Sequence, residues 1–144
     1  MSNNKTYNVA IVGATGAVGK TMLRILEQRQ FPVNNLYLLA SERSAGETMS
    51  FNNKQYTVEN LADFDFTKAQ IGLFSPGASV SAIYAPKAGK AGCIVIDNTS
   101  QFRYQDDIPL VVPEVNPHAI AAYRKHGIIA NPNCTTMAAM PVLK

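Results

Sequence analysis

The sequence predicts an α/β fold in which helices cover both faces of a doubly wound, mostly parallel β-sheet. Three observations support this prediction. Short apolar runs alternate with segments of helical periodicity, the first run ends at a glycine-rich turn, and polar residues follow several of the runs directly. The 144 residues suit one domain, with a hydrophobic fraction of 47% and a charged fraction of 16%.

The first half of the chain begins with a β-branched run that stops at a glycine, which indicates a buried strand. Apolar residues at helical spacing follow, and Phe31-Pro32 should end that helix. The expected elements are a strand at 7–12, a helix carrying Val18, Met22, Ile25 and Leu26, a strand at 36–40, a polar loop at 41–46, and a hairpin whose arms at 49–51 and 56–58 flank 52–55.

The second half repeats the alternation of strand and helix. Pro117 suits the first turn of a helix and Gly127 suits its end. The expected elements are strands at 71–74, 93–96, 110–112 and 128–130, helices at 79–91 (with Pro86 inside) and 117–125, and a last helix near Cys134 that Pro141 should kink or shorten.

Composition excludes several classes of protein. The net charge of +3 comes without a Lys/Arg cluster, so we expect no nucleic-acid partner. No apolar run approaches the ~20 residues that span a bilayer, and residues 1–6 lack the apolar core of a signal peptide. Two cysteines make no disulfide framework, so together with the points above they predict the reducing cytoplasm as the location. No metal site is expected.

A glycine-rich turn follows the first strand and precedes the first helix, which is the context of a phosphate-binding loop. Gly13, Gly16 and Gly19 have the spacing Gly-x-x-Gly-x-x-Gly, a partial match to the dinucleotide pattern Gly-x-Gly-x-x-Gly. Small residues let a pyrophosphate approach the amide groups, and the helix start then offers free N–H groups. A tight strand–helix turn without a ligand is the alternative.

The residue that separates NAD from NADP should lie about 20 positions after the loop, at the end of the second strand. The sequence there is Ser41-Glu42-Arg43-Ser44. Arg43 can pair with a 2′-phosphate to which both serines donate, whereas Glu42 would repel it and is expected to face solvent. We therefore predict NADP, with an ordinary surface loop as the alternative.

A single thiol, Cys134, follows the last strand and a Pro-Asn turn. Unpaired N–H groups at the start of a helix favour an anion, so this thiol is a candidate nucleophile. A small buried apolar role is the alternative, and it suits Cys93 within its strand better. His118 and His126 are expected to be surface helix residues, so the chain shows no obvious general base.

A polar run at 97–103 follows the strand at 93–96 and ends in Arg103. At the carboxyl edge of a parallel sheet, Arg103 could recognise phosphate or carboxylate, and a capped surface loop is the alternative.

Taken together, the motifs resemble one family. Segments 13–19, 40–46, 95–103, 112–116 and 131–136 occur in the order found in the N-terminal part of bacterial aspartate-semialdehyde dehydrogenase, and the resemblance covers essentially all of residues 1–144. It implies a Rossmann-like NAD(P)-binding domain that ends just after the nucleophile. It also implies an enzyme that uses NADPH to reduce the small molecule L-aspartyl 4-phosphate to L-aspartate 4-semialdehyde, for lysine, diaminopimelate, threonine and methionine synthesis.

The resemblance also implies roles for individual residues. Cys134 would be the catalytic nucleophile, which displaces phosphate and forms a thioester. Arg103 and Asn133 would contact the substrate. Gly77 would line the cofactor cleft, although its loop reads Gly-Ala where many relatives have Gly-Gly. The cofactor-binding residues would be Gly13, Thr15, Gly16, Ala17, Val18, Ser41, Arg43, Ser44 and Gly77.

In that family the acid/base histidine belongs to a second domain for substrate binding and dimerisation, which would follow residue 144. We expect the chain by itself to turn over little or nothing, and the full-length enzyme to be a homodimer or homotetramer. Two other functions remain open at this point. One is a sister phosphorylating aldehyde dehydrogenase, acting on glyceraldehyde 3-phosphate or N-acetylglutamyl phosphate. The other is a stand-alone nucleotide-binding or redox-sensing module.

Overall fold

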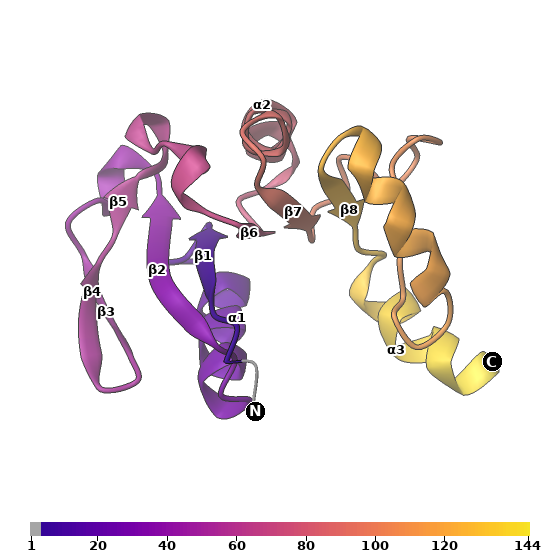
Figure 1. The fold of residues 1–144 in the computed structure, drawn as a ribbon, viewed down its shortest axis with the longest axis horizontal. Coiled ribbons are helices and arrows are strands. Elements are labelled where there is room, and N and C mark those ends of the chain that lie inside the picture. The colour runs from indigo at the N-terminus through magenta and orange to yellow at the C-terminus, as the bar shows by residue number, and fades with distance from the viewer. Residues whose placement is uncertain (1–3) are drawn as a thin grey trace.

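The computed structural model describes residues 4–144, and its main element is a six-stranded sheet (Figure 1). The strand order is β5-β2-β1-β6-β7-β8, and all neighbouring strands are parallel. Numbered within the sheet, this is the 3-2-1-4-5-6 order of doubly wound folds, so the predicted fold class is confirmed. The strands are β1 (Tyr7–Val12), β2 (Val33–Ala40), β5 (Glu59–Asn60), β6 (Ile71–Phe74), β7 (Ile94–Asp97) and β8 (Ile128–Ala130).

Helices lie on both faces of this sheet, with α1 on one side and α2 on the other (Figure 1). A separate antiparallel hairpin, β3 and β4, lies beyond the β2 side of the sheet (Figure 1). The remaining elements are α1 (Ala17–Gln28), η1 (Glu42–Ser44), β3 (Thr48–Phe51), β4 (Lys54–Thr57), η2 (Leu61–Asp63), η3 (Phe66–Lys68), α2 (Ala78–Lys90), η4 (Pro117–Lys125) and α3 (Cys134–Leu143), where η marks a 3₁₀ helix.

The core is divided between the two faces because side chains alternate along a strand. Val9 and Ile11 of β1 pack with Leu23 of α1, whereas Ala10 and Val12 pack on the other face, which α2 covers. All four β1 side chains are fully buried. Burying such a side chain stabilises the fold by about 1.5–3 kcal/mol for Val or Ile, so β1 anchors both halves of the core.

The hairpin of β3 and β4 turns on two asparagines. Asn52 and Asn53 have φ values of 49° and 62°, a left-handed pair that Asn tolerates better than most residues. The loop is therefore shorter than the expected 52–55, because Lys54 and Gln55 already belong to β4. A carboxylate oxygen of Glu27 accepts the Asn52 N–H at 2.6 Å and ties the hairpin to α1.

The structure departs from the sequence prediction in four places. Residues 110–112 form no strand; Leu110 makes a single parallel bridge to Ala130, because Pro109 and Pro113 lack the N–H that would extend the ladder. The two-residue strand β5 was not expected at all. The last helix, α3, continues through Pro141 to Leu143, and the expected helix at 117–125 is a 3₁₀ helix.

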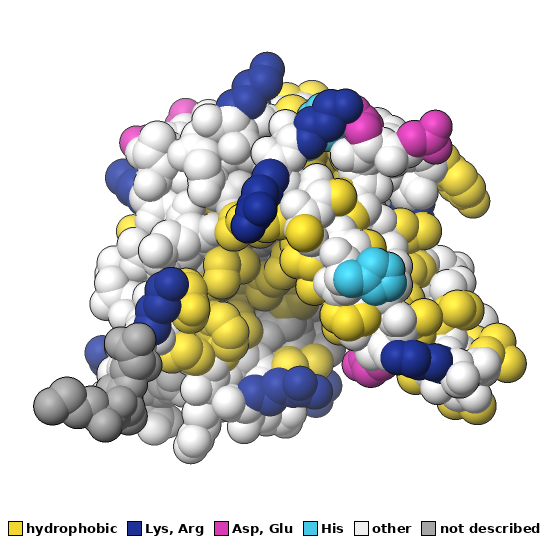
Figure 2. Space-filling model, turned by 45° about the vertical axis from the view of Figure 1, so that its right-hand side comes forward, with side chains coloured by type: hydrophobic (Ala, Val, Ile, Leu, Met, Phe, Trp, Pro, Cys, Tyr) yellow, Lys and Arg dark blue, Asp and Glu magenta, His cyan; other side chains and the backbone are white. Residues whose placement is uncertain are grey.

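The face of the sheet that α1 occupies is covered only in part. Ile71, Leu73, Ile94 and Ile96 are half-buried, whereas the residues that alternate with them in β6 and β7 are buried. Figure 2 shows a hollow lined by hydrophobic side chains, with Lys and Arg side chains around it. None of the residues of α3 is buried in this structure. Within residues 4–144, no helix has the length and apolar character to cross a bilayer.

Candidate functional site

The carboxyl ends of all six strands meet at one edge of the sheet, because the strands are parallel. The glycine turn follows β1 at this edge, and Cys134 follows β8 at the same edge. The chain reverses its direction of winding between β1 and β6, and open α/β sheets bind ligands at such a switch point. Three strand steps of about 4.8 Å separate β1 from β8, so the ends of these two strands lie about 14 Å apart along the edge.

The glycine turn is held tightly against β2 and β6. The amides of Gly13 and Ala14 both donate to the Leu39 carbonyl, at 2.9 and 3.1 Å. A methyl group at Gly13 would meet the Ser75 carbonyl oxygen at 2.6 Å, and one at Gly19 would meet the Gly13 carbonyl oxygen at 2.2 Å. Only glycine fits these two positions, so the turn and the start of α1 lie against each other without intervening side chains.

The start of α1 has the features of an anion site. Gly16 is its N-cap, and the described chain provides no side-chain cap and no acidic residue in the first turn. The first intrahelical donor is Lys20, whose N–H bonds to Gly16 at 3.0 Å. The amides of Ala17 and Val18 are therefore left for a ligand, and the positive end of the helix dipole points the same way. A methyl group at Gly16 would meet only the Gly13 oxygen, at 3.4 Å.

A cavity of about 510 Å³ opens beside this turn. Among the residues expected to bind a cofactor, Gly13, Thr15, Gly16 and Ser41 line it. Ala17, Val18, Arg43, Ser44 and Gly77 do not line it, although Ala17, Arg43 and Gly77 each follow a lining residue directly. The lining residues that sequence reasoning missed are Ala40, Glu42, Asn60, Leu61, Ala62, Ser75, Pro76, Val80 and Tyr84.

The segment after β2 forms the 3₁₀ helix η1, and its charged residues differ from expectation. Glu42 lines the cavity instead of facing away from it, whereas Arg43 is exposed outside the lining. Arg43 forms no ion pair within residues 4–144, so its guanidinium stays available. The carboxylate of Glu42 suits ribose hydroxyls, whereas the guanidinium of Arg43 suits a phosphate.

The turn that carries Cys134 is fixed by the end of β7 and by the loop that follows β7. The Asn131 N–H donates to the Asp97 carbonyl at 2.8 Å, and Arg103 Nε donates to the Asn131 carbonyl at 2.9 Å. The same guanidinium donates from Nη2 to the Asn98 carbonyl at 3.1 Å. Arg103 therefore joins the loops after β7 and β8.

Cys134 is the first residue of α3 and is exposed. The side-chain oxygen of Asn133 caps this helix and accepts the N–H groups of Thr135 at 2.9 Å and Thr136 at 3.2 Å. The second thiol has the opposite environment. Cys93 is buried, and this burial raises its pKa to about 12, so Cys93 is a core residue and not a nucleophile.

The buried carboxylate of Asp97 ends β7 at the same edge. Its Oδ1 accepts the Thr99 N–H at 2.5 Å and shapes the loop that leads to Arg103. The two histidines are exposed, as expected. His126 precedes β8 and bonds to Asp107 at 2.6 Å, at the opposite edge of the sheet from Cys134. Within residues 4–144, no group of three or more His, Cys, Asp or Glu side chains is placed to hold a metal ion.

Comparison with known proteins agrees with this geometry. The family model described as the semialdehyde dehydrogenase, NAD binding domain, matches residues 8–123. The chain is 57% identical to an aspartate-semialdehyde dehydrogenase of Shewanella violacea over 141 residues, which is 98% of this chain and 42% of that protein. The chain therefore spans less than half the length of the relatives that it matches.

Solved structures give the same result. The crystal structure of aspartate semialdehyde dehydrogenase II from Vibrio cholerae complexed with ASA superimposes with a TM-score of 0.96 at 58% identity, over 97% of this chain and 46% of that one. A Candida albicans aspartate semialdehyde dehydrogenase with NADP gives a TM-score of 0.80 at 27% identity, over 97% and 46%. The family match covers the glycine turn and five of the six strands of the sheet, and it ends before β8 and Cys134. This chain belongs to the semialdehyde dehydrogenase family and contains its NAD-binding domain.

Proposed function

We propose that this chain is the part of an aspartate-semialdehyde dehydrogenase that binds NADP and carries the nucleophile. The reaction is the NADPH-dependent reduction of L-aspartyl 4-phosphate to L-aspartate 4-semialdehyde and phosphate. One observation carries this proposal. A glycine turn, leading into a helix with no side-chain cap, and an exposed thiol at the start of another helix lie on the same edge of a parallel sheet.

The glycine turn and the cavity of about 510 Å³ beside it, together called the cofactor crevice, fit a dinucleotide. The unpartnered amides at the start of α1 would hold the pyrophosphate, and the open space above Gly16 leaves room for it. The cavity at the end of β2 would receive the adenosine, with Leu61 and Tyr84 on its apolar walls. Ser41, Arg43 and Ser44 would bind the 2′-phosphate that distinguishes NADP, which requires the Arg43 guanidinium to turn toward the cavity.

Cys134 would attack the acyl carbon of the substrate. A bond forms between Sγ and that carbon, the bond from carbon to the phosphate oxygen breaks, and phosphate leaves. Bound NADPH supplies the hydride that reduces the resulting thioester. The bond between carbon and Sγ then breaks, which releases the aldehyde and regenerates the thiolate. Cys134 is the first residue of α3 and therefore lies at the positive end of the dipole of that helix.

Arg103 would serve two purposes. Of the five N–H donors of a guanidinium, two bond to the carbonyls of Asn131 and Asn98, and the others stay free for the substrate phosphate or carboxylate. The first two bonds fix the turn before Cys134. Asn133 keeps its NH₂ group free while its oxygen caps α3, so it can donate to a substrate oxygen near the sulfur.

We further propose that residues 1–144 form the NAD(P)-binding domain, and that the additional length of the relatives holds a substrate and dimerisation domain with the general acid/base. The full-length enzyme would be a homodimer or homotetramer. The exposed, unpaired thiol of Cys134 supports a reducing compartment, the cytoplasm.

Cofactor choice is tested by calorimetric titration of the 144-residue chain with NADPH and with NADH. We expect NADPH to bind more tightly, and Arg43→Ala to remove that preference while NADH binding stays unchanged. Arg24→Ala, an exposed arginine of α1, is the matched control and should retain the preference. If wild type binds NADH as tightly as NADPH, the carboxylate of Glu42 decides and the NADP assignment is wrong.

Catalysis is tested with the purified chain, L-aspartyl 4-phosphate and NADPH, by following the absorbance of NADPH. We expect little or no turnover by residues 1–144 and normal turnover by a polypeptide of the relatives' length. Cys134→Ser in the long form should abolish turnover while NADPH still binds. Near-normal turnover by the short chain would show that the acid/base lies within it.

A further inference from the structure

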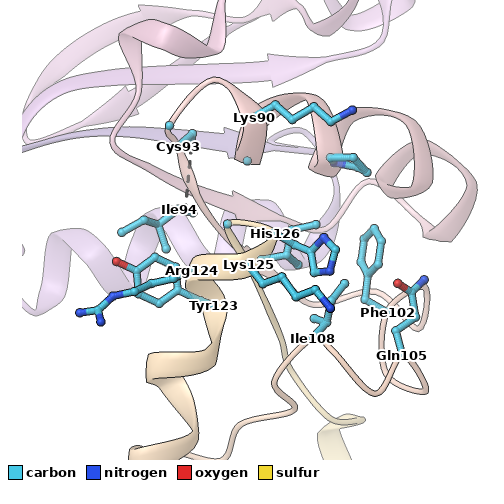
Figure 3. Close-up of a pocket in the computed structure, with 15 residues that line it drawn as sticks. Lys90, Cys93, Ile94, Phe102, Gln105, Ile108, Tyr123, Arg124, Lys125 and His126 are labelled. Carbon is cyan, nitrogen blue, oxygen red and sulfur yellow. Dashed lines mark hydrogen bonds between the residues drawn. The ribbon is translucent and has the colours of Figure 1, made fainter.

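Figure 3 shows a second cavity, of about 590 Å³. It lies at the opposite edge of the sheet from the cavity beside the glycine turn. It opens at the amino ends of β7 and β8, where Gly92 and Gly127 precede the two strands. Strand β7 has four residues and spans about 13 Å at 3.3 Å per residue, so this cavity is separate from the Cys134 edge. Neither the cofactor nor the thiol accounts for it.

The back of this cavity is apolar. Cys93, Phe102, Ile108 and Ile128 line it, and each has an exposed fraction of 5% or less. Ile94 and Tyr123 complete the walls and are only half-buried, so they remain accessible to a ligand. The size lies within the range of about 300–1,000 Å³ that is typical of small-molecule sites, and the walls could hold a ring-sized apolar group.

The floor of the cavity is rigid backbone. The end of α2 meets the turn before β8 so closely that a methyl group at Gly89 would meet the His126 carbonyl oxygen at 2.1 Å. Because no side chain separates the two segments, the cavity exists before a ligand arrives. A pre-formed site loses little free energy in ordering itself on binding.

The rim carries positive charge. Lys90, Arg124 and Lys125 line the cavity, and Lys125 and His126 share Asp107 at 3.0 and 2.6 Å. Lys90 has no ion pair within the described residues. In Figure 3, Lys90 extends along the rim from the end of α2, whereas the guanidinium of Arg124 points outward. Lys90 is therefore the cation best placed for a ligand.

The net charge at the rim selects the class of ligand. Lys90, Arg124 and Lys125 contribute three positive charges and Asp107 one negative charge, with His126 counted as neutral. The α2 and η4 helices both end here, and each helix end contributes about half a negative charge. About one positive charge remains, which a monoanion would balance.

We propose that this cavity is a second binding site, which takes a small amphipathic monoanion: one carboxylate at Lys90 and an apolar ring or branched chain against Ile94, Tyr123 and Ile108. This inference does not depend on the proposed dehydrogenase activity. The cavity touches the end of α2 and the start of β8, whose other ends reach the cofactor crevice and the Cys134 turn.

The test uses phenylacetate and its neutral analogue phenylacetamide as probes, with the ¹⁵N-labelled 144-residue chain observed by NMR. We expect phenylacetate to shift the amide signals of Gly92, Ile94 and Gly127, and phenylacetamide to bind more weakly. Lys90→Ala should weaken phenylacetate binding by about two- to five-fold, the usual contribution of an exposed ion pair. Lys90 is exposed, so this variant should fold normally.

Two further variants sharpen the result. Lys87→Ala, on the same helix but outside the cavity lining, should leave phenylacetate binding unchanged. Asp107→Asn should tighten it, because Lys125 loses its acidic partner. Equal binding of the two probes, no effect of Lys90→Ala, or shifts confined to the amides of Gly13 and Ser75 would each overturn the proposal.

Discussion

The contact between the glycine turn and the loop after β6 can be tested by a single methyl group. Gly13 has a φ of 84°, and a Cβ there would lie 2.6 Å from the Ser75 carbonyl oxygen. An L-residue in this left-handed conformation costs about 1–2 kcal/mol. The close contact with backbone adds about 1–3 kcal/mol, the usual cost of overpacking. Gly13→Ala should therefore destabilise the chain by about 2–5 kcal/mol.

Gly46 is the matched control for this substitution. Its φ of 92° is similar, but a Cβ there would have no neighbour within 4 Å. Gly46→Ala should therefore cost only the conformational strain, about 1–2 kcal/mol. The difference between the two variants isolates the contact with Ser75.

The measurement is thermal unfolding followed by circular dichroism. An unfolding entropy of about 2.1 cal/mol/K per residue converts 1 kcal/mol into a fall in Tm of about 3 °C for 144 residues. We expect falls of about 7–17 °C for Gly13→Ala and about 3–7 °C for Gly46→Ala. Equal falls in Tm for the two variants would mean that the loop after β6 moves away from the added methyl group without cost. The reasoning about a rigid turn would then be wrong.

Three other predictions concern the thiols, the α3 cap and acid stability. Native chain should expose one thiol to Ellman's reagent, Cys134, and urea should reveal Cys93, which is buried. Asn133→Ala should speed amide exchange in α3 about five-fold, from a lost cap of about 1 kcal/mol, whereas Asn133→Ser should not. Hydrogen bonds from His126 and its neighbouring lysine lower the pKa of Asp107 from 3.8 to about 2. This stabilisation is present above about pH 4 and is lost toward pH 2. The free energy of unfolding, measured by urea titration, should therefore fall less steeply below pH 4 for Asp107→Asn than for wild type.

Most of the fold could be predicted because its main elements are set by local pattern. The apolar run at 7–12 and the glycines after it predict strand, turn and helix, and β1 and α1 lie there. The strand expected at 110–112 does not form, because apolar character does not by itself supply backbone hydrogen-bond partners and prolines flank the segment. β5 was missed because its two residues are defined only by their pairing with β2.

The candidate site was predicted only where its residues follow a strand in a recognisable motif. Gly13, Gly16 and Ser41 line the cavity of about 510 Å³ at such positions. Leu61 and Tyr84 also line it, but they come from elements with no motif of their own, and only the packing of α2 against the sheet brings them there.

The sequence by itself determined most of the order of strands and helices, the glycine turn and the thiol at the start of the last helix, because these depend on periodicity and on the short-range demands of backbone geometry. Only the tertiary structure decided that Glu42 and not Arg43 faces the cavity, that Arg103 holds the Asn131 carbonyl, and that a charged cavity lies at the far edge. Side-chain direction and contacts between distant segments follow from the sheet register, which pairs residues far apart in the chain and which no local pattern contains.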